Sequence, residues 1–118
     1  MGKGRPGIEY RVVGRSGDGV VVQLAGELTG AGHAGRLREG LEEQFVDDGV
    51  RVITIDASTI TFVDNYGVAA LLDLRRESER QGKRLVVEGT DGQVRDKLRV
   101  TGVLNLLEGG EEIQRGGS

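Results

Sequence analysis

His33, the single histidine, is the first candidate for chemistry, because an imidazole can act as a base or bind a metal. A metal site needs further ligands, and the chain has no second histidine and no cysteine to supply them. The same shortage leaves no nucleophile–base pair for catalysis. We therefore expect no enzyme activity, no metal site and no cofactor, and we interpret His33 as a structural or solvated residue.

A glycine-rich segment, GRSGDG from Gly14 to Gly19, has some likeness to a phosphate-binding loop. Such loops bind phosphate where they open a helix whose N–H groups point at the ligand. This segment instead lies between two expected strands, and its Asp-Gly pair suits the positive φ of a tight hairpin. The pattern predicts a hairpin turn between two antiparallel strands.

A third candidate is the turn from Asp64 to Gly67, which follows an apolar strand and opens an apolar helix. Sites in open α/β sheets tend to lie at such strand ends. Asp64 can cap the first turn of the helix, and Gly67 allows close packing of the backbone. Neither role explains Tyr66, which we expect either to fill a pocket or to stand exposed.

The charges exclude several classes of protein. Acidic and basic residues alternate at helical spacings, which indicates solvated helix faces, and the net charge of -3 argues against nucleic-acid binding. No apolar run is long enough for a membrane span or a signal peptide. We expect a cytoplasmic protein without membrane insertion. Acidic residues interrupt the one basic run, so we interpret it as an ordinary solvated surface and not as a phosphate-binding or nucleic-acid-binding patch. This run comprises Arg75, Arg76, Arg80, Lys83 and Arg84.

The elements that must position these residues follow from hydrophobic periodicity, which predicts the order β-β-α-β-α-β-α-β. The expected strands are residues 8–14, 20–24, 50–58, 84–89 and 103–107. The expected helices include residues 34–45, 65–81 and 94–98, and a glycine-rich connection covers 28–35. Alternating strands and helices imply an α/β fold with a mostly parallel sheet of four to five strands, opened by an antiparallel hairpin.

The length of 118 residues fits one domain. We place this domain at residues 8–107 and expect flexible segments at 1–7 and 108–118, which are rich in glycine. The strands at 50–58 and 84–89 are largely apolar, so we expect them to be buried on both faces.

These segments resemble a STAS domain, the fold of anti-sigma-factor antagonists. In this family an apolar strand ends in Asp and is followed by a short loop. A turn with an apolar residue before an Asp then opens an apolar helix. After the helix, a Gly and a Lys or Arg lead into the next strand. The matching residues here are Asp56, Val63, Asp64, Gly67, Leu71, Leu72, Gly82, Lys83 and Arg84. VVVQLAGEL at 20–28 is similar to the family's second strand, with Thr29 in place of an Asp, and residues 94–107 are similar to its third helix and last strand.

The resemblance implies a bacterial regulator of transcription without catalytic activity. Its partner would be an anti-sigma factor or a serine/threonine switch kinase, and the protein would be a monomer or a weak homodimer. Expected partner-binding residues are Thr29, Asp64, Asn65, Tyr66, Gly67, Val68, Thr90 and Asp91. In this interpretation Tyr66 anchors the interface.

Two features depart from the family. Switchable members carry a Ser or Thr acceptor after the loop aspartate, whereas this chain has Asn65 and Tyr66 there. The Ser/Thr phosphorylation switch is therefore expected to be lost at this loop; Ser58, Thr59, Thr90 and Tyr66 are the other hydroxyls nearby. The family's C-terminal helix is replaced by EGGEEIQRGGS, which is expected to form a turn or two at most.

Two other functions stay open. The chain could be an accessory subunit that binds the ATPase of an ABC-type lipid transporter, or a scaffold of a signalling complex, since some STAS proteins without a phosphorylation switch have such roles. It could also sense a small molecule or nucleotide through Asn65 and the helix N–H groups beside it.

Overall fold

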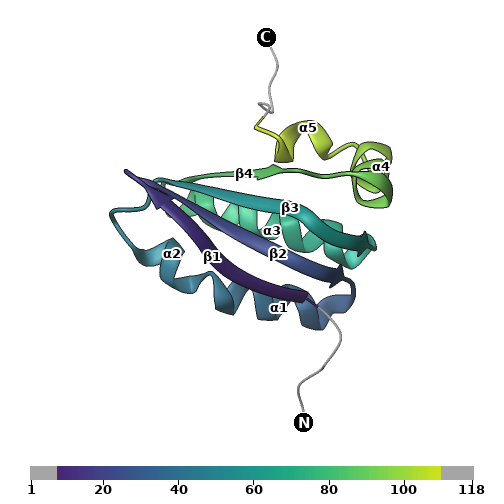
Figure 1. The fold of residues 1–118 in the computed structure, drawn as a ribbon, viewed down its shortest axis with the longest axis horizontal. Coiled ribbons are helices and arrows are strands. Elements are labelled where there is room, and N and C mark those ends of the chain that lie inside the picture. Colours follow the sequence, from purple (N-terminus) through teal and green to yellow (C-terminus); the bar gives the residue numbers. More distant parts are fainter. Residues whose placement is uncertain (1–7, 110–118) are drawn as a thin grey trace.

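The fold is an α/β arrangement, described for residues 8–109 by a computed structural model (Figure 1). The strands are β1 (Ile8–Ser16), β2 (Gly19–Leu28), β3 (Val52–Val63) and β4 (Arg84–Glu88). The helices are α1 (Gly30–Gly40), α2 (Glu42–Val46), α3 (Asn65–Arg80), α4 (Gly92–Val100) and α5 (Leu104–Leu107). The flexible segments expected at 1–7 and 108–118 lie outside the described residues, apart from Glu108 and Gly109.

The four strands form one sheet in the order β1-β2-β3-β4. β1 pairs antiparallel with β2, while β2–β3 and β3–β4 are parallel, which confirms the predicted mixed sheet opened by a hairpin. Figure 1 shows α1, α2 and α3 along one face of the sheet and α4 and α5 beyond β4. The core lies between the sheet and its helices, and it includes Val94 and Leu98 of α4 and Leu107 of α5.

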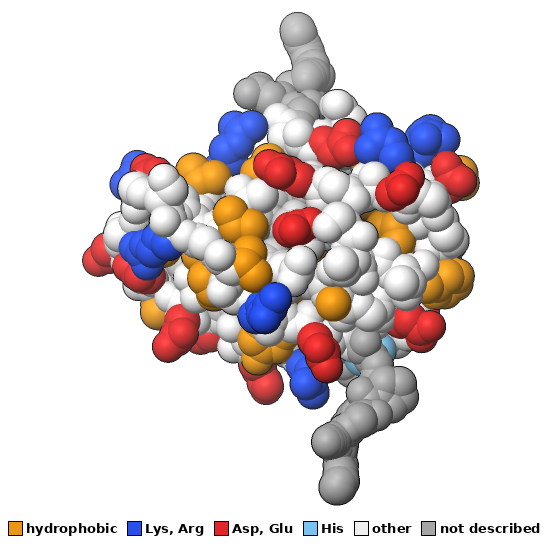
Figure 2. Space-filling view, viewed as in Figure 1, with side chains coloured by type: hydrophobic (Ala, Val, Ile, Leu, Met, Phe, Trp, Pro, Cys, Tyr) orange, Lys and Arg blue, Asp and Glu red, His pale blue; other side chains and the backbone are white. Residues whose placement is uncertain are grey.

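Only one face of the central strands is fully buried. In β2 and β3 every second residue of the paired region is buried, for example Val22, Leu24, Ile53 and Ile55, and the residues between them stay partly exposed. The expectation that β3 and β4 are buried on both faces is therefore wrong, because in residues 8–109 helices cover only one face. Figure 2 shows the other face, where hydrophobic side chains are scattered among charged ones.

The first helix begins earlier than expected. α1 starts at Gly30, so the glycine-rich segment is helical and His33 lies in its first turn. Glycine disfavours a helix. Here the Asp64 carboxylate accepts a hydrogen bond from the Gly30 N–H and so stabilises this end of α1. A tertiary contact has overridden the local preference.

The hairpin turn between β1 and β2 consists of Gly17 and Asp18. The positive φ falls on Gly17, at 58°, and not on the Asp18–Gly19 pair as predicted. The carbonyl of Asp18 accepts hydrogen bonds from the N–H groups of Arg51 and Val52. The turn thus holds the beginning of β3.

β3 is longer than predicted, so Ser58 and Thr59 lie in a strand and not in a loop. Its pairing with β2 shifts register between Gln23 and Ala25 and again between Gly26 and Glu27. Two hydroxyls stabilise this irregular part: Thr59 Oγ1 donates to the Leu24 carbonyl at 2.7 Å, and Thr61 Oγ1 donates to the Gly26 carbonyl at 3.2 Å.

The C-terminal piece expected as a strand is the short helix α5. Leu107 of α5 is fully buried, whereas its neighbours Leu104 and Leu106 are partly exposed. The capping glycines expected after α3 and α4 are confirmed, because Gly82 and Gly102 have φ values of 75° and 81°.

Lys83, expected on a solvated surface, is buried with 9% of its surface exposed. Its ammonium group donates to the carbonyl oxygens of Asp47 at 2.7 Å and Val50 at 2.6 Å. Lys83 therefore connects the end of α3 to the segment that leads from α2 into β3.

Replacing Lys83 with methionine should destabilise the domain by about 1–3 kcal/mol, because a part-buried carbonyl group and a buried one lose their donor. Chemical denaturation of both proteins measures the difference. Arg76→Met on the exposed face of α3 is the matched control and should change stability by less than about 0.5 kcal/mol. Equal effects of the two substitutions would contradict the anchoring role of Lys83.

Candidate functional site

The Asp64 carboxylate joins the beginnings of two helices. Its Oδ1 accepts from the Gly67 N–H at 2.8 Å and caps α3, while its Oδ2 accepts from the Gly30 N–H of α1 at 3.2 Å. The backbone N–H of Asp64 donates to the Leu28 carbonyl at 3.3 Å. The end of β2 and the end of β3 are therefore held together by one residue, Asp64, through its side chain and its backbone.

Gly67 lies where the two loops are closest. A Cβ atom at this position would overlap the carbonyl oxygen of Leu28 and Cγ2 of Val63. Gly67 itself is buried, and its helical backbone places no demand on φ. Glycine is thus required here by space, as the sequence suggested, and it allows α3 to begin against the end of β2.

Two residues of this turn, Asn65 and Tyr66, face solvent. Tyr66 has 60% of its surface exposed, and Phe62, four residues earlier at the end of β3, has 43%. Tyr66 therefore does not fill a pocket. An exposed aromatic ring on a fixed helix end is a surface well suited to contact with another protein. We refer to residues Asp64–Gly67, the N-cap and first turn of α3, as the docking loop, after the role that we propose for them.

Thr29 lies beside the docking loop, next to the Gly30 amide that Asp64 binds. Its side chain makes no capping hydrogen bond to α1. Its backbone N–H donates to Nδ1 of His33 at 3.0 Å. Nδ1 of the imidazole is therefore the acceptor of this hydrogen bond. His33 thus has the structural role that the sequence indicated.

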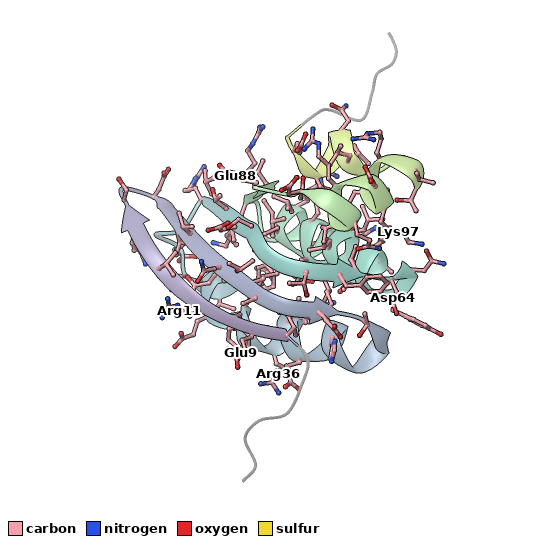
Figure 3. The ribbon with its side chains drawn as sticks, turned by 45° about the vertical axis from the view of Figure 1, so that its right-hand side comes forward. Glu9, Arg11, Arg36, Asp64, Glu88 and Lys97 are labelled. Atoms are coloured by element: carbon pink, nitrogen blue, oxygen red, sulfur yellow. The ribbon has the colours of Figure 1, made fainter. Side chains whose placement is uncertain are left out.

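A residue that the sequence analysis missed holds α4 to the same end of the sheet. The side-chain amide of Gln93 accepts from the Val63 N–H at 3.0 Å and donates to the Val63 carbonyl at 2.9 Å. Gln93 therefore pairs with β3 beyond the end of β4, as another strand would. In Figure 3 Asp64 and Lys97, which belongs to α4, lie toward the same end of the molecule.

The other predicted site residues differ in what they can offer. Asp91 caps α4 by accepting from the Gly92 N–H at 2.8 Å and is exposed. Thr90 is 8% exposed, and its hydroxyl accepts from Arg95 at 3.1 Å. Val68 is 6% exposed and lies in the core beneath the docking loop. Thr90 and Val68 therefore support the site and contribute little surface.

The hydroxyls of β3 are engaged or lie beside a negative charge. The Ser58 backbone N–H donates to Oδ1 of Asp56 at 3.0 Å. This bond, reinforced by the Ser58 and Gln23 side chains, lowers the pKa of Asp56 and keeps its carboxylate charged. A phosphate on Ser58 would meet that charge, and the Thr59 hydroxyl already donates to Leu24.

No group of three or more His, Cys, Asp or Glu side chains is arranged to hold a metal ion within residues 8–109. No helix in the same range has the length and apolar character needed to cross a membrane.

Comparison with known proteins gives one family and a set of similar folds. The model of the family described as "Mlab, STAS domain" matches residues 12–108. The search of curated proteins found no match.

Three solved structures illustrate the likeness in fold. The anti-sigma factor antagonist SpoIIAA in its unphosphorylated form is 22% identical, with a TM-score of 0.67 over 81% of this chain and 83% of that one. An anti-sigma factor antagonist from Mycobacterium paratuberculosis is 22% identical, with a TM-score of 0.65 over 90% and 86%. The murine anion transporter Slc26a9 is 20% identical, with a TM-score of 0.68 over 78% of this chain and 15% of that one. At these identities the likeness concerns the fold.

Proposed function

This chain belongs to the STAS-domain family, and from that premise we propose that it is a non-catalytic regulator of the anti-sigma-factor-antagonist type. It docks an anti-sigma factor or a switch kinase through the docking loop. The observation that carries the proposal is the exposed Tyr66 ring on a helix end that Asp64 and Gly67 fix in place. The fold shared with two anti-sigma factor antagonists supports it.

The partner surface extends from the docking loop to its neighbours. Thr29 lies on one side, and Asp91 at the beginning of α4 lies on the other. Phe62 adds a second exposed aromatic ring. The docking loop is held in one conformation by three residues on its inner side, Asp64, Gly67 and Val68.

This docking surface works without a Ser/Thr phosphorylation switch. Asn65 and Tyr66 occupy the positions after the loop aspartate, and neither can be phosphorylated by a serine/threonine kinase. The nearest β3 hydroxyls are bonded to Leu24 or lie next to the charged Asp56. We therefore expect a surface that stays permanently competent to bind.

Replacing Tyr66 with alanine should weaken partner capture about tenfold or more, as expected for the loss of an aromatic interface anchor. Wild-type and variant proteins are used as bait in cell extract, and the amount of captured anti-sigma factor is measured. Tyr66→Phe should keep capture, because the ring remains. Val100→Ala, which removes another exposed apolar side chain at 82% exposure on α4, is the control.

Thermal unfolding of Tyr66→Ala separates binding from folding. The melting temperature should change little, because the ring is exposed. A domain that unfolds on this substitution would show that Tyr66 is part of the core and would refute its role as an anchor. Loss of capture with Tyr66→Phe as well would point to the hydroxyl, as a hydrogen-bond donor or a tyrosine phosphorylation site.

A second candidate function stays open, because an anion transporter, Slc26a9, contains a segment with the same fold. In this case the chain is an accessory subunit that binds the ATPase of an ABC-type transporter. The same capture experiment distinguishes the two functions. Recovery of an ABC ATPase with no anti-sigma factor would favour the transporter role.

A further inference from the structure

The outer edge of the sheet carries a surface that the docking loop does not use. Within residues 8–109, β1 is an edge strand, because it lies at the end of the strand order and pairs with β2 alone. Three of its apolar side chains are exposed: Tyr10 at 39%, Val12 at 51% and Val13 at 47%. An edge strand of this kind presents a row of unpaired backbone N–H and C=O groups that another strand can bind.

The first half of β1 is the part suited to pairing. From Ile8 to Val12 it pairs with β2 in regular register, and the register then shifts between Val12 and Gly14. Such a bulge twists a strand away from a straight edge and ends regular pairing. A partner strand on β1 is therefore confined to Ile8–Val12, which we call the β1 edge.

The charges on the β1 edge match a second copy of the same segment. Glu9 and Arg11 are both exposed and are two residues apart, so they lie on the same face of the sheet. Figure 3 shows both on the outermost strand. Within residues 8–109 neither has an ion-pair partner. Each charge is thus available to a partner.

We propose that two copies of this chain associate through antiparallel pairing of their β1 edges, centred on Tyr10. In this register Glu9 of each copy lies opposite Arg11 of the other, which gives two opposite-charge pairs on one face of the sheet. Cross-strand pairs of opposite charge stabilise antiparallel strands. On the other face Ile8 lies opposite Val12, and the two Tyr10 rings meet at the twofold axis.

The position of Tyr10 favours this arrangement. Its ring packs over Gly40 of α1, where a Cβ atom would overlap the ring. The side chain at the centre of the interface is therefore held in place before association, which lowers the entropy lost on binding. Two four-stranded sheets joined in this way form one continuous sheet, and the antiparallel arrangement places the two docking loops at opposite ends.

Exchange of the two charges tests the register directly. Glu9→Arg alone and Arg11→Glu alone should each weaken self-association about tenfold, or about 1.4 kcal/mol, because two like-charge pairs replace two opposite ones. Sedimentation velocity over a concentration series measures this. Glu88→Arg makes the same charge change on β4, at the far edge of the sheet, and should leave association unchanged.

Mixing the two single variants gives the decisive result. The introduced arginine then faces the introduced glutamate, while native Arg11 faces native Glu9, so the mixture should associate at least as well as wild type. The double variant should also associate. Unfolding curves confirm that every variant is folded. A wild-type protein that stays monomeric up to about 1 mM, or a mixture that does not associate, would overturn the proposal.

Discussion

Replacing Gly67 with alanine is expected to destabilise the domain by about 3 kcal/mol, the upper part of the range for overpacking. The added methyl group would overlap the Leu28 carbonyl oxygen and the Val63 side chain. Leu28 is the last residue of β2 and Val63 the last of β3, so neither can move without disturbing the sheet. The melting temperature should fall by roughly 12 °C for a domain of this size.

Gly35→Ala is the matched control for this prediction. Gly35 also lies in a helix, but outside its own stretch of helix no atom lies within 4 Å of a Cβ built there. Alanine is the better helix former, so this substitution should stabilise α1 by about 0.5–1 kcal/mol. A Gly67→Ala protein as stable as wild type would show that the end of β2 and the beginning of α3 can move apart. It would contradict the conclusion that the docking loop is held in one conformation.

Replacing Asp64 with alanine should cost about 2–3 kcal/mol, because two helices lose an acceptor at the same time. A helix cap normally satisfies one helix, whereas Oδ1 of Asp64 binds α3 and Oδ2 binds α1. Asp64→Asn keeps one acceptor oxygen and presents an NH₂ group to the other N–H, so its loss should be intermediate. Chemical denaturation of the wild type, Asp64→Asn and Asp64→Ala measures their free energies of unfolding, which should fall in that order.

Asp91→Ala supplies the comparison with a single cap. Asp91 binds only the Gly92 N–H of α4 and is exposed, so its loss should cost about 1 kcal/mol or less. Asp64→Ala should therefore lower the free energy of unfolding more than Asp91→Ala does. Equal losses would show that capping two helices with one carboxylate adds no stability over capping one. Partner capture should fall with Asp64→Ala even at temperatures where the variant is folded, because the docking loop loses its anchor.

The parts of the fold that were predictable are those coded by local patterns. The start of α3 after Asp64 and the ends of α3 and α4 at Gly82 and Gly102 follow from capping and periodicity, and the structure confirms them. The mixed sheet follows from the order of elements. The order of elements and local residue types singled out the turn from Asp64 to Gly67, and the exposure of Tyr66 answers the question that its sequence raised.

The parts that could not be predicted depend on contacts between distant segments. α1 begins inside a glycine-rich segment because Asp64, 34 residues away, binds its first amide. Lys83 is buried because two carbonyl groups far from it in sequence need a donor. Gln93 pairs with Val63 across 30 residues. No local pattern of residues contains information about such partners.

The double cap also determines the electrostatics of the docking loop. Each helix N-terminus carries about half of a positive elementary charge from its aligned peptide dipoles. The N-termini of α1 and α3 both bind the Asp64 carboxylate, so their two partial positive charges balance its negative charge. The centre of the docking loop is therefore close to neutral and attracts no anion of its own. A partner should recognise it through contact with the Tyr66 ring, and this part of the binding energy should depend little on salt.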